Sequence, residues 1–320
     1  MYNESTKTEF INSITQSESA RKNYIALFDS IQPYEERWGD DICTRSIEDI
    51  RPIIEQVTGF RANAQYSRVM VLKKYTKWCV ERKIPGAIDS MRDFDKLDSV
   101  NKLKTHTLSS PAHLQFYLDS ILSGVSANTV DNTFRCFYWL AYGGMAERDI
   151  VLTKSSDINF QTMSIRYRTT EIPIYREALS AFRFCAESDY FNYEHPNFTN
   201  ANAIAKPRVS GDLLLRNCRS QPNLLSFRST LSHISKKALD TGKTNLEMSY
   251  YRVWMSGWFY RVYEAEQIGI QPDFRPIALR TMELKTSPEK LHTPEMHTKI
   301  LRYAREYNTD YIRWKEAYKV

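Results

Sequence analysis

The chain has little glycine and proline, only 10 and 12 among its 320 residues. An all-β protein uses many more of both in its turns, so this shortage favours a mainly helical fold. Hydrophobic residues make up 42% and charged residues 26%, the balance of an ordinary globular protein. This composition excludes disorder for most of the chain, and at roughly 150 residues per domain the length predicts two domains.

Cysteine is also scarce. The five cysteines are odd in number and widely spaced, and no two of them form a CxxC pair. The six histidines do not cluster with them at the spacing of metal ligands. We therefore expect neither a zinc site nor a disulfide framework, no cofactor, and a reducing compartment.

Long apolar runs are missing as well. The longest, residues 136–142, has seven residues, whereas a helix needs about 20 to span a bilayer. Residues 1–20 are polar and acidic, unlike a signal peptide. The sequence thus predicts a cytoplasmic protein.

What the chain does have is positive charge gathered in two tracts, within a formal net charge of +6. Residues 61–83 carry seven Lys or Arg against one acid, and residues 204–243 carry eight against two. Because phosphate contacts supply much of the affinity of proteins for nucleic acid, two such tracts are what a protein that contacts DNA at two places would carry. Two basic but merely solvated helix faces would give the same pattern.

Apolar residues at helical spacing predict most of the secondary structure. Capping patterns predict helix starts at Thr15, Ser46, Ser110 and Asn128. Further helices are expected over 176–187, about 210–217, 222–238, 246–266 and 294–317.

A short β region interrupts the helices. Residues 157–160, 163–167 and 171–175 alternate β-branched or aromatic with polar side chains, which predicts a three-stranded meander. The predicted fold class is therefore mainly α with a small three-stranded β meander. We expect a helical domain at 1–100, a linker at 101–110 and a second domain at 111–320.

The order of these elements resembles that of the tyrosine recombinases, or phage integrases. The motifs that carry the resemblance are Arg135-x-Phe-x-Trp-Leu-Ala-Tyr-x-Gly-Met145, Ser156-Asp-Ile158 and the meander after them. The resemblance implies a SAM-like core-binding domain followed by a catalytic-type domain, which together clamp duplex DNA. In that family a tyrosine attacks a backbone phosphate, while two arginines, a lysine and a histidine stabilise the transition state.

This chain departs from the family at the positions that carry the chemistry. Ala146 occupies the place of the first arginine, in the turn after the motif helix. The H-x-x-R motif is matched by Ser249 and Arg252, which keeps the arginine but not the histidine. The meander hairpin offers Arg168 instead of a lysine, and its pKa is too high for a general acid. No tyrosine near the C-terminus has the context of the nucleophile, so we expect no catalytic residue and no enzyme activity.

A recombinase fold without its chemistry most resembles the lytic-cycle master repressor (MrpR) family of SPbeta-like phages. The stretches that carry this closer resemblance are residues 75–80, 139–145, 256–261 and 310–318. It implies a sequence-specific, double-stranded DNA-binding repressor that silences phage lytic genes and maintains lysogeny. It also implies phage promoter or operator DNA as the partner. We further expect a nucleoid-associated location in the bacterial cytoplasm and a phage-encoded antagonist or regulatory partner, although no residue marks the latter.

The candidate DNA-contacting residues are basic side chains of the two tracts, the hairpin and the H-x-x-R match. They are Lys73, Lys74, Lys77, Arg166, Arg168, Arg208, Arg216, Arg219, Arg228 and Arg252. The alternative for each is an ordinary solvated or ion-paired side chain, and for Arg252 it is an ion pair with Glu247. Two other classes of function stay open: an active recombinase that exchanges strands through a phosphotyrosine intermediate, and a module that assembles with other proteins.

Overall fold

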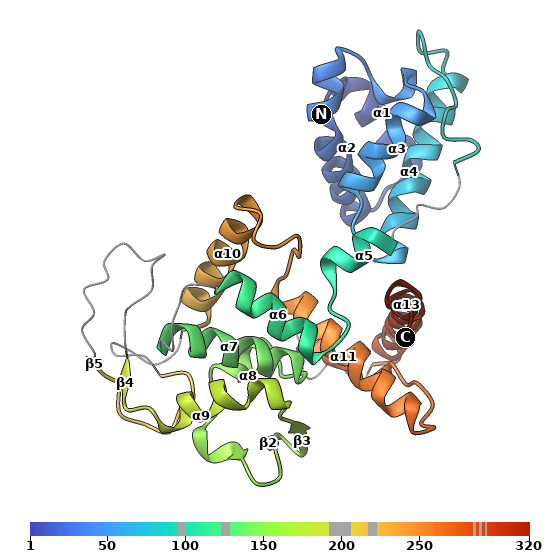
Figure 1. Ribbon diagram of the computed structural model, residues 1–320. Coiled ribbons are helices and arrows are strands. Elements are labelled where there is room, and N and C mark those ends of the chain that lie inside the picture. The colour runs from blue at the N-terminus through green and yellow to red at the C-terminus, as the bar shows by residue number, and fades with distance from the viewer. Residues whose placement is uncertain are drawn as a thin grey trace. The chain divides into compact units, whose positions relative to one another are not determined.

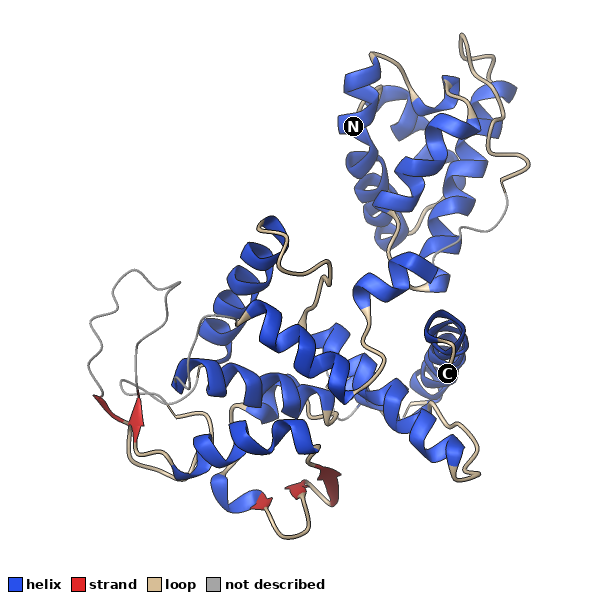
Figure 2. Ribbon diagram, in the orientation of Figure 1, coloured by secondary structure: helices blue, strands red, loops and turns tan. Residues whose placement is uncertain are grey.

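The computed structural model is mainly helical, and strands appear in its described part as two small sheets (Figure 2). It describes residues 1–94, 100–122, 129–191, 206–216, 223–283, 286–287, 290–291 and 293–320. The chain divides into two compact units, Met1–Leu103 and Lys104–Val320 (Figure 1). The predicted fold class is confirmed.

The first unit consists of helices. Its elements are α1 (Glu4–Ile14), α2 (Glu18–Trp38), the 3₁₀ turn η1 (Ile42–Thr44), α3 (Ile47–Val57), α4 (Ala62–Glu81) and the start of α5 (Val100–His106). Ser46 caps α3 as predicted, since its hydroxyl accepts the Asp49 N–H at 3.4 Å. The predicted cap at Thr15 is wrong: Thr15 ends α1, and Ser17 caps α2 instead. Helix α1 is not predicted from the sequence, and the start of α2 is therefore predicted too early.

The core of the first unit surrounds Tyr75 of α4. Its ring lies 5.1 Å from that of Phe10 and 5.0 Å from that of Phe28, both at steep angles. The same core encloses an ion pair between Lys7 and Glu35, both fully buried. Because Tyr75 and the other buried residues of α4 occupy the face that packs into this core, the lysines of the helix lie on its outer face.

The helices of the second unit include several that the sequence predicts. They are α6 (Pro111–Ile121), α7 (Thr129–Tyr142), α8 (Glu147–Ile150), α9 (Leu179–Glu187), α10 (Leu224–Asp240), α11 (Tyr250–Gln267), α12 (Arg275–Glu283) and α13 (Pro294–Tyr318), with 3₁₀ turns η2 (Ser155–Asp157) and η3 (Arg176–Ala178). Ser110 caps α6 as expected, whereas the predicted cap Asn128 lies outside the described residues. Helix α12 was not predicted.

The helix predicted at about 210–217 is wrong within the described residues. This segment bends and pairs with the loop before η2 instead. The N–H of Ser155 donates to Asp212 O at 2.7 Å, and that of Leu214 to Thr153 O at 2.8 Å. Because these bonds tie the backbone to a distant loop, it does not coil into a helix of its own.

The predicted meander is confirmed as an antiparallel sheet in the order β1-β2-β3. Its strands are β1 (Ile158–Asn159), β2 (Ser164–Tyr167) and β3 (Thr170–Pro173). Pro173 lies on edge strand β3, where a missing N–H costs least. A second pair, β4 (Tyr190–Phe191) with β5 (Lys206–Pro207), was not predicted.

Helix α7 is the central element of the second unit and packs against α9 and α11 (Figure 1). The backbones of α7 and α11 approach each other closely at Gly257. A Cβ atom there would lie 1.8 Å from Tyr142 O, so this helix contact requires glycine. The start of α11 lies beside the turn that follows α7, since the Tyr250 hydroxyl donates to Met145 O at 2.7 Å, and both carry positions matched to the recombinase motifs.

Candidate nucleic-acid interface

The three candidate lysines of the first unit lie on the outer side of α4. Lys74 and Lys77 are exposed and Lys73 is half-buried. Lys77 forms a loose i,i+4 pair with Glu81 at 3.7 Å, and Lys73 Nζ donates to Arg92 O at 3.3 Å. These contacts leave the positive charges at the surface, where a phosphate can reach them.

Ala146 serves as a structural turn residue. It precedes α8 as its N-cap, and its N–H donates to the Tyr167 hydroxyl at 3.1 Å. That hydroxyl donates in turn to Asp149 Oδ2 at 2.6 Å, and burial raises the pKa of Tyr167. The methyl group of Ala146 lines a cavity of about 220 Å³ that is also lined by Arg168 and Arg280.

The two hairpin arginines are held by acids. Arg166, which is well exposed, pairs with Asp157 at 2.8 Å. Arg168 adopts a left-handed backbone conformation (φ +56°) and pairs with Asp149 at 2.9 Å and with Glu283 at 3.2 Å. Arg168 therefore belongs to an ion-pair network around the cavity at Ala146.

Ser249 and Arg252 begin α11. The Ser249 hydroxyl caps the helix by accepting the Arg252 N–H at 3.4 Å, so it does the work of a cap where the family has a histidine. Arg252 Nη1 lies 2.9 Å from Glu247 Oε2. The alternative considered for Arg252, an ion pair with Glu247, is the arrangement in this structure.

A groove of about 680 Å³ brings several of these positions together. Residues from α10 and from the start of α11 line it, among them Arg228, Lys236, Ser249 and Arg252. Arg228 Nε donates to Glu147 Oε1 at 2.8 Å. The structure thus joins Arg228, Ser249 and Arg252 in one groove, while Ala146 and Arg168 line the other cavity.

Of the three candidate arginines between residues 206 and 219, one is buried, one is partly buried and one lies outside the described residues. Arg208 is 7% exposed and its Nη1 donates to Cys185 O at 2.8 Å. This burial contradicts the expectation that Arg208 is available to a phosphate. Arg208 is buried against α9, and the sequence around Arg208 does not reveal this contact. Arg216 is partly buried, and Arg219 lies outside the described residues.

The C-terminal tyrosines of α13 are engaged in packing and hydrogen bonds. Tyr307 and Tyr311 are buried. The Tyr318 hydroxyl donates to Thr107 O at 2.6 Å, and burial raises its pKa to about 12. Such hydroxyls are poor nucleophiles near neutral pH because little of the phenolate forms.

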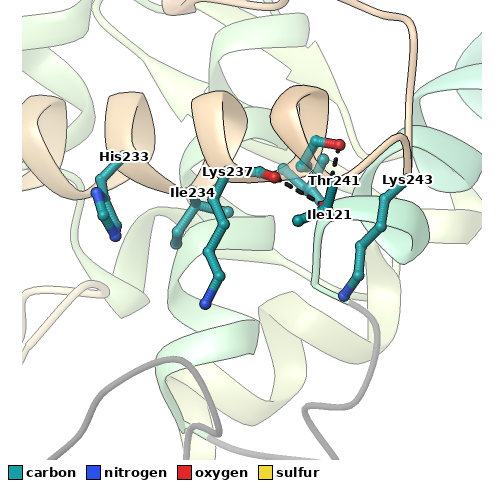
Figure 3. A pocket seen from close by; sticks show the side chains of 7 residues that line it. Ile121, His233, Ile234, Lys237, Thr241 and Lys243 are labelled. Carbon is teal, nitrogen blue, oxygen red and sulfur yellow. Dashed lines mark hydrogen bonds between the residues drawn. The ribbon is translucent and has the colours of Figure 1, made fainter.

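Sequence reasoning missed three residues near these surfaces. His106 contacts Glu247 from the end of α5, with 2.7 Å between Nε2 and Oε2. His233 lies on α10 beside a small pocket, with Lys237 and Lys243 directed to the same side (Figure 3). Glu147 holds Arg228. A lone histidine carries no sequence signal of such a contact, whereas the two lysines belong to the second basic tract.

The described part of the chain contains no group of three or more His, Cys, Asp or Glu side chains that could hold a metal ion. None of its described helices is both long and apolar enough to cross a membrane.

Comparison with known proteins gives a match to one family model. Residues 1–81 match the model described as MrpR, N-terminal core-binding domain. The resemblance expected for the first helical domain is confirmed over these residues. No curated protein matches the chain.

Solved structures of recombinases resemble the chain at low identity. The Tn1549 transposon integrase in complex with circular intermediate DNA is 13% identical with a TM-score of 0.35, over 84% of this chain and 88% of that chain. The XerA recombinase is 12% identical with a TM-score of 0.35, over 82% of this chain and 85% of that chain.

Proposed function

We propose that the protein is a sequence-specific, double-stranded DNA-binding repressor of phage lytic genes, built on a recombinase-like fold without recombinase activity. The observation that carries the proposal is the match of residues 1–81 to the core-binding domain of MrpR. The exposed lysines of α4 lie within this match and supply charge suited to phosphates.

The chemistry at the matched catalytic positions supports a protein that binds and does not cut. Ala146 presents a methyl group and Ser249 is committed to capping α11. Loss of one donor to a transition state costs about 3–4 kcal/mol, or two to three powers of ten in rate. Losing an arginine, a lysine and a histidine together removes most of the stabilisation on which phosphoryl transfer depends.

The proposed contacts comprise most of the basic residues expected from the sequence. We retain Lys73, Lys74, Lys77, Arg166, Arg168, Arg216, Arg228 and Arg252, and Arg219 as a residue outside the described part of the chain. The partner is duplex DNA at phage promoters or operators, in the cytoplasm of the bacterial host, and a phage-encoded antagonist relieves repression.

The test is to select bound fragments from the sheared genome of the source phage and then denature each complex. We expect fragments to cluster at promoters and to be released completely by denaturant. Protein that stays attached to DNA after denaturation would identify a working tyrosine nucleophile and an active recombinase. Fragments without any preferred position would point to the protein-assembly role instead.

A further inference from the structure

The Glu247 carboxylate is shared between two side chains of the second unit. Its Oε2 atom lies 2.9 Å from Arg252 Nη1 and 2.7 Å from His106 Nε2. His106 Nδ1 is 2.8 Å from the Thr105 hydroxyl, so the ring has a hydrogen-bond partner on its other side as well. One anionic oxygen thus meets two nitrogen donors, the geometry in which a phosphate oxygen is bound.

The three side chains are exposed to solvent to different extents, and this bears on whether another anion can replace the Glu247 carboxylate. The Glu247 side chain is 54% exposed, whereas those of Arg252 and His106 are 23% and 10% exposed. The anion is therefore the outer member of the cluster and the nitrogen donors lie behind it. An anion arriving from solvent can replace the carboxylate without moving either donor, and the carboxylate can turn into water.

In the ion pair between Arg228 and Glu147, which lines the same groove, the arginine is more exposed than the acid. The Arg228 side chain is 54% exposed and its partner Glu147 only 10%. Here the cation already faces solvent and the carboxylate is held beneath it. Glu147 orients Arg228, whereas Glu247 covers Arg252.

We propose that Glu247 is an internal competitor for a DNA backbone phosphate, which displaces its carboxylate and takes its place on Arg252 and His106. The inference rests on the proposed function and adds to it a residue that limits affinity. Arg228 and Lys236 line the same groove as Arg252 and add positive charge there, although Glu147 balances the charge of Arg228. Glu247 is also held through its backbone, since its N–H donates to Thr105 O at 2.8 Å and its carbonyl oxygen accepts from Arg252 Nη1.

The experiment is a double-mutant cycle on DNA affinity with the full-length protein and a promoter fragment that it binds, at one fixed salt concentration. Glu247→Gln should bind up to about fivefold more tightly, the range expected when one partly exposed ion pair no longer competes. Arg252→Ala should bind more weakly. In the Arg252→Ala background, Glu247→Gln should give no gain, because the site that the carboxylate covers is gone.

Glu266→Gln is the matched control, because it removes the same charge at the C-terminal end of α11, whereas Glu247 precedes the start of that helix. Glu266 also holds a cation, with Lys315 Nζ at 2.9 Å. Equal gains from both Gln variants would mean that only net charge matters and would overturn the inference. Glu247→Gln keeps the backbone bond to Thr105, and its own thermal unfolding checks that any change in its affinity is not misfolding.

The outcomes separate this inference from the proposed function. If the unmodified protein binds promoter fragments and Glu247→Gln is no tighter, only the competitor role fails. A gain that persists without Arg252 likewise refutes it. If none of the variants binds duplex DNA even at low salt, the proposed function fails and this inference with it.

Discussion

Lys7→Met would remove the cation from a buried cluster of the first unit. Lys7 Nζ lies 2.5 Å from both carboxylate oxygens of Glu35 and 3.7 Å from Asp41 Oδ2. The side chains of Lys7 and Glu35 are 0% exposed. After the substitution Glu35 keeps the Ile42 N–H, which donates to its Oε1 at 2.9 Å, but its charge is no longer balanced by Lys7.

The loss of stability comes from the charge of Glu35, which Lys7→Met leaves in the core without its partner. Removing one partner of a buried pair costs about 3–5 kcal/mol, because the other charge stays in a low-dielectric site. In a unit of this size each kcal/mol shifts the midpoint by about 4–8 °C, so the transition should fall by at least about 12 °C. Lys7→Met combined with Glu35→Leu should recover most of the loss, since both charges are then gone. Lys22→Met, in an exposed pair with Glu18, should cost at most about 1 kcal/mol.

The loss should also depend on pH. Burial raises the pKa of the Glu35 carboxyl even though Lys7 opposes the shift. A carboxyl whose pKa is higher in the folded than in the unfolded state stabilises the fold at pH values below its ordinary pKa, where it is protonated. This stabilisation is lost as the pH rises through the folded-state pKa. Without Lys7 the pKa rises further, so the deficit of Lys7→Met should be larger at pH 7 than at pH 5.

Calorimetry of the full-length protein at both pH values measures these effects on the first-unit transition. A midpoint for Lys7→Met within about 2 °C of the unmodified protein at pH 7 would refute the reasoning, since the substitution should cost several times that. A deficit that grows on acidification would refute it equally.

Three further predictions follow from the other sites. Gly257→Ala should destabilise the second unit by about 1–3 kcal/mol or more in thermal unfolding, because its Cβ would lie 1.8 Å from Tyr142 O; an unchanged midpoint would mean that α7 and α11 separate easily. Lys77→Ala should reduce the dependence of DNA affinity on salt by about one unit of slope, whereas Lys22→Ala, an exposed helix lysine in a similar i,i+4 pair, should not; identical slopes would remove Lys77 from the interface. Ala146→Arg should still give no covalent adduct on nicked DNA, and an adduct on a denaturing gel would show that the remaining groups suffice for cleavage.

The fold was predictable where local patterns decide the structure. Ser46 and Ser110 cap helices as expected, and the meander forms over the alternating residues, because caps and strand alternation are read over a few residues. The prediction failed where distant segments compete for the backbone. Residues near 213 pair with the loop before η2, and α1 uses Thr15 as its end.

The candidate site was harder to predict because its contacts join distant parts of the chain. His106 and Glu247 meet although some 140 residues separate them, and no local pattern at either position marks the contact. Glu247 itself was the alternative partner considered for Arg252, because it is an acid only five residues away in the sequence. Arg208 shows the converse: its charge counts toward a basic tract, but packing near Cys185 removes it from the surface.

A basic tract in the sequence therefore specifies how many cations are present but not how many a polyanion can reach. Whether a polyanion can reach a given cation depends on which member of its ion pair is more exposed to solvent. Arg166 and Arg228 are the more exposed members of their pairs, so a phosphate can approach them while their acids remain in place. At Arg252 the acid is outermost, and a phosphate gains that contact only by displacing it. If the proposed function holds, Arg228 and Arg252 in the same groove should therefore contribute differently to DNA affinity, Arg228 as a direct contact and Arg252 as a contact that forms only when Glu247 is displaced.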